Sequence, residues 1–187
     1  GSKWGGKLGR ANKGLFDACM TFEIPLISGK DSMANDCTKV DPPISILPTL
    51  LFSILGPVEI QQILSLEPLK EGDLVYILGN TNGQLAASQL NHYLAAIGKC
   101  DNVLSGTLPN VNLNESKNLI DCISEINQEH LLHSCHAPGM GGLIIGLCKK
   151  VIASGFGLKI KLDDRETLSD LEYLFSEDSG RMIITFD

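Results

Sequence analysis

Apolar residues recur along this chain with two different spacings, which together predict interleaved helices and strands. Apolar residues recur at the three- and four-residue spacing of one helix face at Leu15, Phe16, Cys19 and Met20. Residues 74–79 instead form a continuous apolar run, which is typical of a strand buried on both faces. The same reasoning predicts helices at 10–22, 59–66, 84–97, 115–129 and 143–154, and strands at 24–27, 44–55, 74–79, 131–135, 156–162 and 181–186.

Because strands and helices alternate throughout, the predicted fold class is α/β or α+β. Gly56 and Pro57 interrupt the apolar pattern, so we expect one unit over residues 1–57 and a second over residues 58–187. The chain opens with a glycine-rich stretch that lacks hydrophobic periodicity, and it closes directly after a predicted strand. Both features lead us to expect a piece of a larger protein.

The charge balance argues against one class of partner. Asp and Glu (22 residues) outnumber Lys and Arg (15 residues), and the net charge of -7 comes without a basic cluster. Nucleic-acid binding needs a basic face, so we expect no nucleic-acid partner. Backbone amides could still hold a small phosphorylated ligand.

Neither a membrane segment nor a zinc site is indicated. The longest apolar stretch, residues 44–55, is too short to span a bilayer and contains Pro48. The six cysteines are scattered without a CxxC pair, which is typical of free thiols in a reducing compartment. We therefore expect a cytoplasmic protein that has no membrane association.

Three polar segments carry candidate chemistry, and the first is residues 28–32. Gly29 would let a ligand approach the backbone, and Lys30 offers a charge for phosphate or carboxylate. Asp31 and Ser32 could contact a metal or a hydroxyl group. From the residues alone, a polar β-turn that binds nothing is the favoured alternative.

The second segment is a glycine-rich turn at 136–142, between a predicted strand and a predicted helix. Free amides at the start of that helix would suit a phosphate, and His136 could act as a ligand. A tight strand–helix connection is the alternative. The third segment, residues 174–181, places Glu177 in an acidic loop before a strand, where it could serve a metal, a substrate or only solvent.

Taken in order, these segments resemble the second half of phosphoribosylformylglycinamidine (FGAM) synthase. The resemblance covers about residues 7–186 and depends on the order and spacing of its pieces. Those pieces are IPLISGKDSM at 24–33, PTLLFS at 48–53, GDLVYILG at 72–79, the Gly141-Gly142-Leu143 helix start, and LFSE at 174–177 with Gly180-Arg181.

This resemblance implies an ATP-dependent ligase of purine biosynthesis. The family makes FGAM from formylglycinamide ribonucleotide (FGAR), ATP and glutamine-derived ammonia, with magnesium as the metal. Each of its two halves pairs an N-terminal barrel-forming domain with a C-terminal α/β domain, and both resemble aminoimidazole ribonucleotide (AIR) synthetase. Residues 1–57 would be the tail of such an N-terminal domain and residues 58–187 most of a C-terminal domain. The first half and a glutaminase domain or subunit would lie elsewhere.

The resemblance also implies roles for individual residues. Gly29 would face the nucleotide and Ser32 the substrate, within a 29–32 loop that lines the nucleotide and substrate cleft. Lys30 stands where many shorter relatives have a magnesium-binding Asn. The residues of the family's turn motif are retained at His136, Gly141 and Gly142.

Ala137, however, replaces the family's metal-binding Asp, and Met140 replaces an acid. We therefore assign nucleotide or substrate binding to this chain, but no catalytic residue and no metal ligand.

The sequence leaves three functions to weigh, of which we favour the first. The chain could be an inactive fragment of an active FGAM synthase, which the retained Lys30, Asp31 and Ser32 favour. It could be a non-catalytic paralog that serves as a binding or assembly module, which Ala137 favours. It could also belong to another ATP-using enzyme of the AIR synthetase superfamily, although the 29–32 and 48–53 pattern fits that reading less well.

Overall fold

The computed structural model describes residues 2–30, 36–46, 49–66, 70–162 and 167–187, without the side chains of residues 2–4. The chain divides into two compact units, Gly1–Val58 and Glu59–Asp187. Mixed helices and a small antiparallel sheet confirm the predicted α/β (α+β) class. No helix in the described part of the chain has the length and apolar character that crossing a membrane requires.

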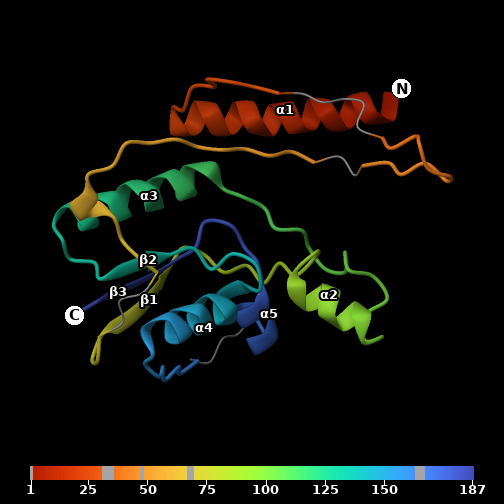
Figure 1. Cartoon of the computed structure of the whole chain (residues 1–187). Helices are drawn as coiled ribbons and strands as arrows, with labels where there is room; N and C mark the ends of the chain where they lie inside the picture. Colours follow the sequence, from red (N-terminus) through yellow and green to blue (C-terminus); the bar gives the residue numbers. More distant parts are fainter. Residues whose placement is uncertain (1, 31–35, 47–48, 67–69, 163–166) are drawn as a thin grey trace. The chain divides into compact units, whose positions relative to one another are not determined.

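The first unit consists of one long helix followed by extended chain (Figure 1). Helix α1 spans Ser2–Phe22, so it extends the helix predicted at 10–22 through the glycine-rich opening. A growing helix gains one hydrogen bond per residue, which offsets the roughly 1 kcal/mol that each glycine costs relative to alanine.

The strands predicted at 24–27 and 44–55 are absent from the described residues of this unit, which show only a Cys37–Ile44 bridge. Residues 47 and 48 of the second prediction lie outside the described part. A strand exists only where a neighbouring strand supplies hydrogen bonds. Apolar side chains such as Leu51 and Leu55 are therefore exposed, and none of the first unit's described side chains is buried.

The second unit is built on a three-stranded antiparallel sheet of order β1-β3-β2. Strand β1 spans Leu74–Leu78, β2 spans Ser134–His136 and β3 spans Met182–Phe186. The central strand is β3, whose Ile183, Ile184 and Thr185 are buried. The prediction that the 74–79 run is buried on both faces was wrong, because β1 lies at an edge of the sheet and alternates between exposed and half-buried residues.

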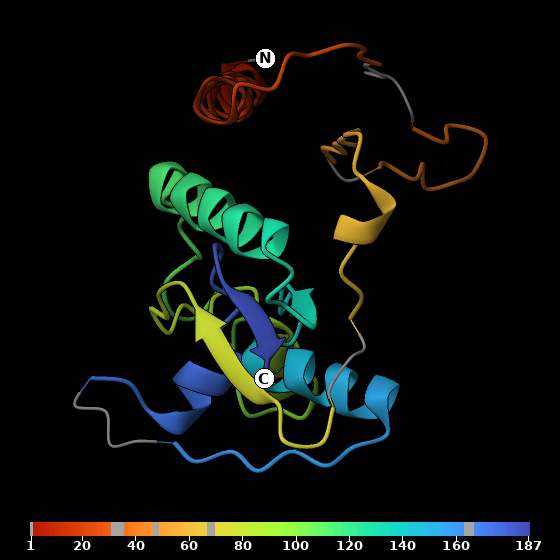
Figure 2. The ribbon, with the colours of Figure 1, turned by 90° about the vertical axis from the view of Figure 1, so that its left-hand side faces the viewer.

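Helices lie on both faces of this sheet. Figures 1 and 2 show α3 (Leu113–Gln128) over one face, and α4 (Gly142–Ser154) with α5 (Asp170–Phe175) over the other. The predicted helices at 115–129 and 143–154 are thus confirmed. Helix α4 ends at Gly155 in the left-handed conformation, a common helix terminus.

Other predicted elements change at their boundaries. Helix α2 spans only Gln89–Ala96, because Ser88 caps it by accepting a hydrogen bond from the Asn91 N–H. The helix predicted at 59–66 reduces to the 3-10 turn η1 (Ile60–Gln62). The short helix α5 was not predicted; it begins at a capping box formed by Ser169 and Glu172, a signal that the sequence did contain.

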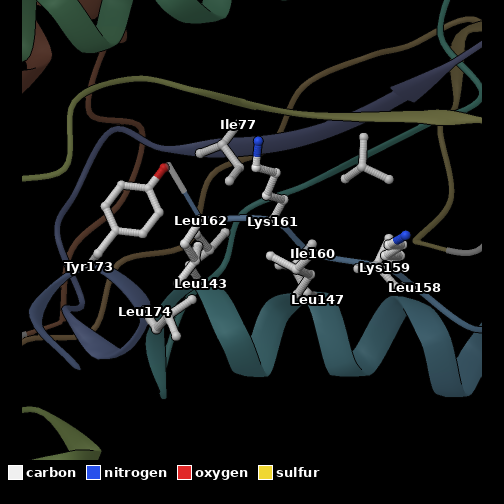
Figure 3. Close-up of a pocket in the computed structure, with 11 residues that line it drawn as sticks. Ile77, Leu143, Leu147, Leu158, Lys159, Ile160, Lys161, Leu162, Tyr173 and Leu174 are labelled. Carbon is white, nitrogen blue, oxygen red and sulfur yellow. The ribbon is translucent and has the colours of Figure 1, made fainter. Parts of the chain in front are cut away.

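The core of the second unit lies between the sheet and α4, where Leu143 and Leu147 pack against Ile183. Beside it is a cavity of about 570 Å³, lined by β1, α4, α5 and residues 158–162 (Figure 3). Residues 156–162 do not form the predicted strand. The cavity wall therefore includes the side chains of an extended segment, Leu158 among them, that the alternating pattern had assigned to a sheet.

A lysine is buried beneath this sheet. The Lys150 side chain is 0% exposed, and its Nζ donates to Ser134 Oγ and to the Leu66 carbonyl oxygen. Ser134 Oγ in turn lies 2.6 Å from Thr185 Oγ1. Burial lowers the pKa of the Lys150 ammonium group, and attraction to Cys135 and Asp73 only partly opposes this.

We predict that Lys150 makes stability depend on alkaline pH. The unfolded lysine binds its proton more tightly than the folded one, so the free energy of unfolding should rise as pH increases toward the ordinary lysine pKa of about 10.4. Urea unfolding of the wild type and Lys150→Met, between about pH 7 and pH 10, should therefore show a difference that shifts in favour of the wild type. Lys149→Met, at an exposed neighbour, is the control. A difference that stays constant with pH would contradict the prediction.

We predict that the start of α4 tolerates no side chain at Gly142. Its φ is +71°, and a Cβ there would lie 2.5 Å from the Ser176 carbonyl oxygen and 2.7 Å from the Phe175 carbonyl carbon. Gly142→Ala should lower the free energy of unfolding by about 3 kcal/mol. Gly139→Ala is the matched control, since it also has positive φ but only Ala137 O at 3.9 Å, and should cost about 1 kcal/mol. Equal losses in urea unfolding would show that close packing is not the cause.

Candidate functional site

The glycine turn after β2 is the candidate site that the structure assembles most completely. Strand β2 ends at His136, and α4 begins at Gly142 after the left-handed Gly141, which has φ +87°. The Gly142 N–H donates to the Gly139 carbonyl oxygen over 3.2 Å, so the turn closes on its own backbone.

Packing explains both glycines that begin α4. At Gly142 the backbone of residues 174–176 approaches too closely for any Cβ, and at Gly141 a Cβ would lie 2.5 Å from the Ile145 side chain. The tight strand–helix connection considered from the sequence is therefore present. Packing alone explains both glycines, without a ligand. The first-turn amides of α4 nevertheless have no hydrogen-bond partner within the helix.

The carboxylate of Glu177 holds this turn against a second loop. Its Oε1 accepts hydrogen bonds from the Gly141 N–H over 2.9 Å and from the Gln89 N–H, at the start of α2, over 2.7 Å. The sequence singled out Glu177 only as part of an acidic loop, and it gave no sign of Gln89. Pairing between residues 88 positions apart is a property of the tertiary structure.

The residue after Glu177 fixes the loop that follows β1. Asp178 is 7% exposed, and its carboxylate accepts hydrogen bonds from the N–H groups of Asn82, Gly83 and Gln84 at 2.8–3.2 Å. The Ser176 hydroxyl donates to the same carboxylate over 2.9 Å. The acidic loop is therefore not a solvated turn, because Asp178 is buried and satisfied by protein donors.

Arg181 completes the same cluster. It is 2% exposed, and its guanidinium donates to the carbonyl oxygens of Ser176 and Asp178 and to Thr81 Oγ1. These hydrogen bonds run to backbone carbonyls and a hydroxyl rather than to a carboxylate. Burial lowers the pKa of Arg181, and Asp178 opposes that change.

His136 presents the one buried side-chain polar atom without a hydrogen-bond partner among the described residues, its Nε2. Burial and the charges of Lys150 and Lys149 lower the pKa of this imidazole. It is therefore neutral at pH 7 and can donate or accept a single hydrogen bond at each ring nitrogen.

The turn does not fit a magnesium ion. Ala137, Gly139 and Met140 carry no side-chain oxygen, and magnesium is bound through oxygen ligands. The Glu177 oxygen nearest the turn already accepts two N–H groups.

Elsewhere in the described chain, Asp73, His133 and Asp187 lie close enough to share an ion. Lys70 Nζ, however, is 3.2 Å from His133 Nε2, and a second cation there would be repelled. Burial raises the pKa of Asp73, but hydrogen bonds from the Lys70 N–H and the His133 ring leave it below its ordinary value. These residues therefore form a network of interacting polar and charged side chains, made up of Lys70, Asp73, His133 and Asp187.

The first predicted site lies in the other unit. Gly29 and Lys30 are exposed on extended chain, and a Cβ on Gly29 would meet nothing within 4 Å. Asp31 and Ser32 lie outside the described residues. The structure therefore brings together His136, Gly141, Gly142 and Glu177, whereas the 29–32 loop stays a sequence-based hypothesis.

Comparisons with known proteins bear on the whole chain. Residues 70–187 match the family described as "AIR synthase related protein, C-terminal domain". The chain is 32% identical over 178 residues to the phosphoribosylformylglycinamidine synthase subunit PurL of Thermococcus sibiricus, covering 94% of this chain and 23% of that protein.

The PurL subunit of Methanocaldococcus jannaschii is 31% identical over 183 residues, covering 95% of this chain and 24% of the subunit. That of Thermococcus kodakarensis is 34% identical over 176 residues, covering 93% and 23%. This chain thus spans about a quarter of the length of these relatives.

The match extends over more than half of the chain, and it falls on the unit whose sheet, glycine turn and acidic loop have just been described. The resemblance to FGAM synthase is thereby confirmed at the level of family. The chain belongs to the AIR synthase related protein family, through a C-terminal domain at residues 70–187.

Proposed function

We propose that this chain is part of an ATP-dependent FGAM synthase, a C–N ligase that converts FGAR, ATP and glutamine-derived ammonia into FGAM in purine biosynthesis. The observation that supports this most strongly is the similarity of 92–95% of the chain to PurL subunits, in both units rather than in the C-terminal domain alone. A cytoplasmic location agrees with this role and with six free cysteines.

Within that enzyme, the glycine turn would meet a phosphate group through backbone amides. The first-turn N–H groups of α4 point out of the helix and carry its positive end, which suits an anion. The neutral His136 could add one hydrogen bond. Gly29, Lys30, Asp31 and Ser32 would line the nucleotide and substrate cleft, as the family resemblance implies.

The chain by itself would bind without catalysing. Its first unit has no buried side chain among the described residues and exposes Phe16, Leu51 and Leu55. A surface of this kind calls for a covering partner. We propose that the partner is the first half of the synthase, and that glutaminase chemistry comes from another domain or subunit.

A second candidate function is a non-catalytic paralog that acts as a binding or assembly module. Ala137 and Met140 favour it, because neither can hold the metal that accompanies a nucleotide phosphate. In the first candidate, these substitutions mark only an auxiliary nucleotide site that has decayed.

We predict that the purified chain shows no magnesium-dependent binding of ADP, because the turn has no side-chain oxygen for the ion. Isothermal titration calorimetry with ADP and magnesium should give the same heat as the titration with ADP and EDTA. Micromolar binding that EDTA abolishes would show that another group supplies the metal ligands.

The proposed activity is tested with the full-length parent protein, supplied with FGAR, ATP, magnesium and ammonia. We expect ADP and FGAM to form together, and we expect no repeated turnover from this chain alone. If the folded parent shows no turnover, the non-catalytic candidate replaces the ligase. Turnover by this chain alone would contradict the assignment of catalysis to the missing half.

A further inference from the structure

The Glu177 carboxylate joins the start of α2 to the turn that precedes α4. One oxygen of its carboxylate accepts the N–H groups of Gln89, the first residue of α2, and of Gly141, the cap of α4. Hydrogen bonds to an ionised carboxylate are about twice as strong as neutral ones. The two helix starts are therefore held by a single charged group.

The backbone around Glu177 is anchored on both sides. Ser176 before it is fully buried, and its N–H donates to the Glu172 carbonyl oxygen at 3.1 Å. Asp178 after it carries the hydrogen bonds to residues 82–84. The half-buried Glu177 side chain therefore reaches the starts of α2 and α4 from a backbone that is held on both sides.

The start of α2 is itself tied to a third segment. The Ala86 and Ala87 N–H groups donate to the carbonyl oxygens of Thr107 and Val103 at 3.1 and 2.8 Å. A second, weak contact between α2 and the turn runs over 4.0 Å from Gln89 Nε2 to Met140 Sδ. Glu177 is therefore the strong connection between the turn and the 86–89 loop.

We propose that Glu177 is a positioning residue for the phosphate-facing turn. It touches no ligand and acts through Gly141, whose N–H it fixes, so that the first-turn amides of α4 and the start of α2 keep one relative position. This proposal rests on the proposed function only for the identity of the ligand. The mechanical coupling of the two loops is independent of that function.

The test compares Glu177→Ala and Glu177→Gln with Glu125→Ala, an exposed carboxylate of α3 that serves as control. Amide hydrogen exchange followed by NMR reports on the Gln89 and Gly141 N–H groups, with Ile184 of β3 as the internal reference. In Glu177→Ala, exchange of both amides should rise about tenfold while Ile184 stays unchanged, and Glu177→Gln should show a smaller rise at both. Glu125→Ala should leave all three unchanged.

Faster exchange at only one of the two amides, or at neither, would overturn the coupling. If Glu177→Ala does not fold, Glu177→Gln decides the matter by the same criterion, since it keeps the size of the side chain and a neutral acceptor.

A titration with ATP in the presence of EDTA separates this proposal from the proposed function. We expect the wild type and Glu125→Ala to bind alike, and Glu177→Ala to bind about tenfold more weakly. Unchanged affinity in Glu177→Ala would overturn the positioning role. No ATP binding by the wild type would instead refute the phosphate role of the turn, and amide exchange would still decide whether Glu177 couples the loops.

Discussion

The carboxylate of Asp178 is the group on which the arrangement of the second unit depends. A buried carboxylate costs on the order of several kcal/mol unless hydrogen bonds compensate for its lost water. Here the backbone N–H groups of residues 82–84 and the Ser176 hydroxyl donate to this carboxylate. Arg181 adds to the cluster by donating to the Asp178 carbonyl oxygen. Because the donors come from the loop after β1 and the acceptor lies just before β3, this requirement brings the ends of neighbouring strands together. Glu177 extends the same cluster to α2 and α4.

This arrangement separates the fold of the glycine turn from its chemistry. Gly141 and Gly142 are required by the close approach of Ile145 and residues 174–176, and Glu177 holds the turn from outside. None of these contacts involves the side chains at positions 137 and 140. The side chains at these two positions can therefore change without altering the shape of the turn.

The two units differ in what they bury. The second has a core of Leu143, Leu147 and Ile183 around its sheet, together with a satisfied polar cluster. The first keeps aliphatic side chains on extended backbone that has no ladder in the described residues, apart from one bridge. A strand-like sequence forms no strand where no neighbouring strand pairs with it. The described apolar side chains of the first unit, such as Leu51 and Leu55, accordingly stay exposed.

The sequence by itself determined the elements whose signals are local. Periodicity and a terminal glycine predicted α4, a continuous apolar run predicted β1, and ordered motifs pointed to the family. Only the tertiary structure decided which strand is central. Strand β3 is more buried than β1 because it lies between two other strands, and no local sequence pattern contains the order of strands in a sheet. The same holds for the candidate site. Glu177 was visible as an acidic residue, but its link to Gln89 and Gly141 arises from chain segments that meet only after folding. Which distant residues form hydrogen bonds depends on the packing of the whole unit, so the type of a single residue does not predict its partners.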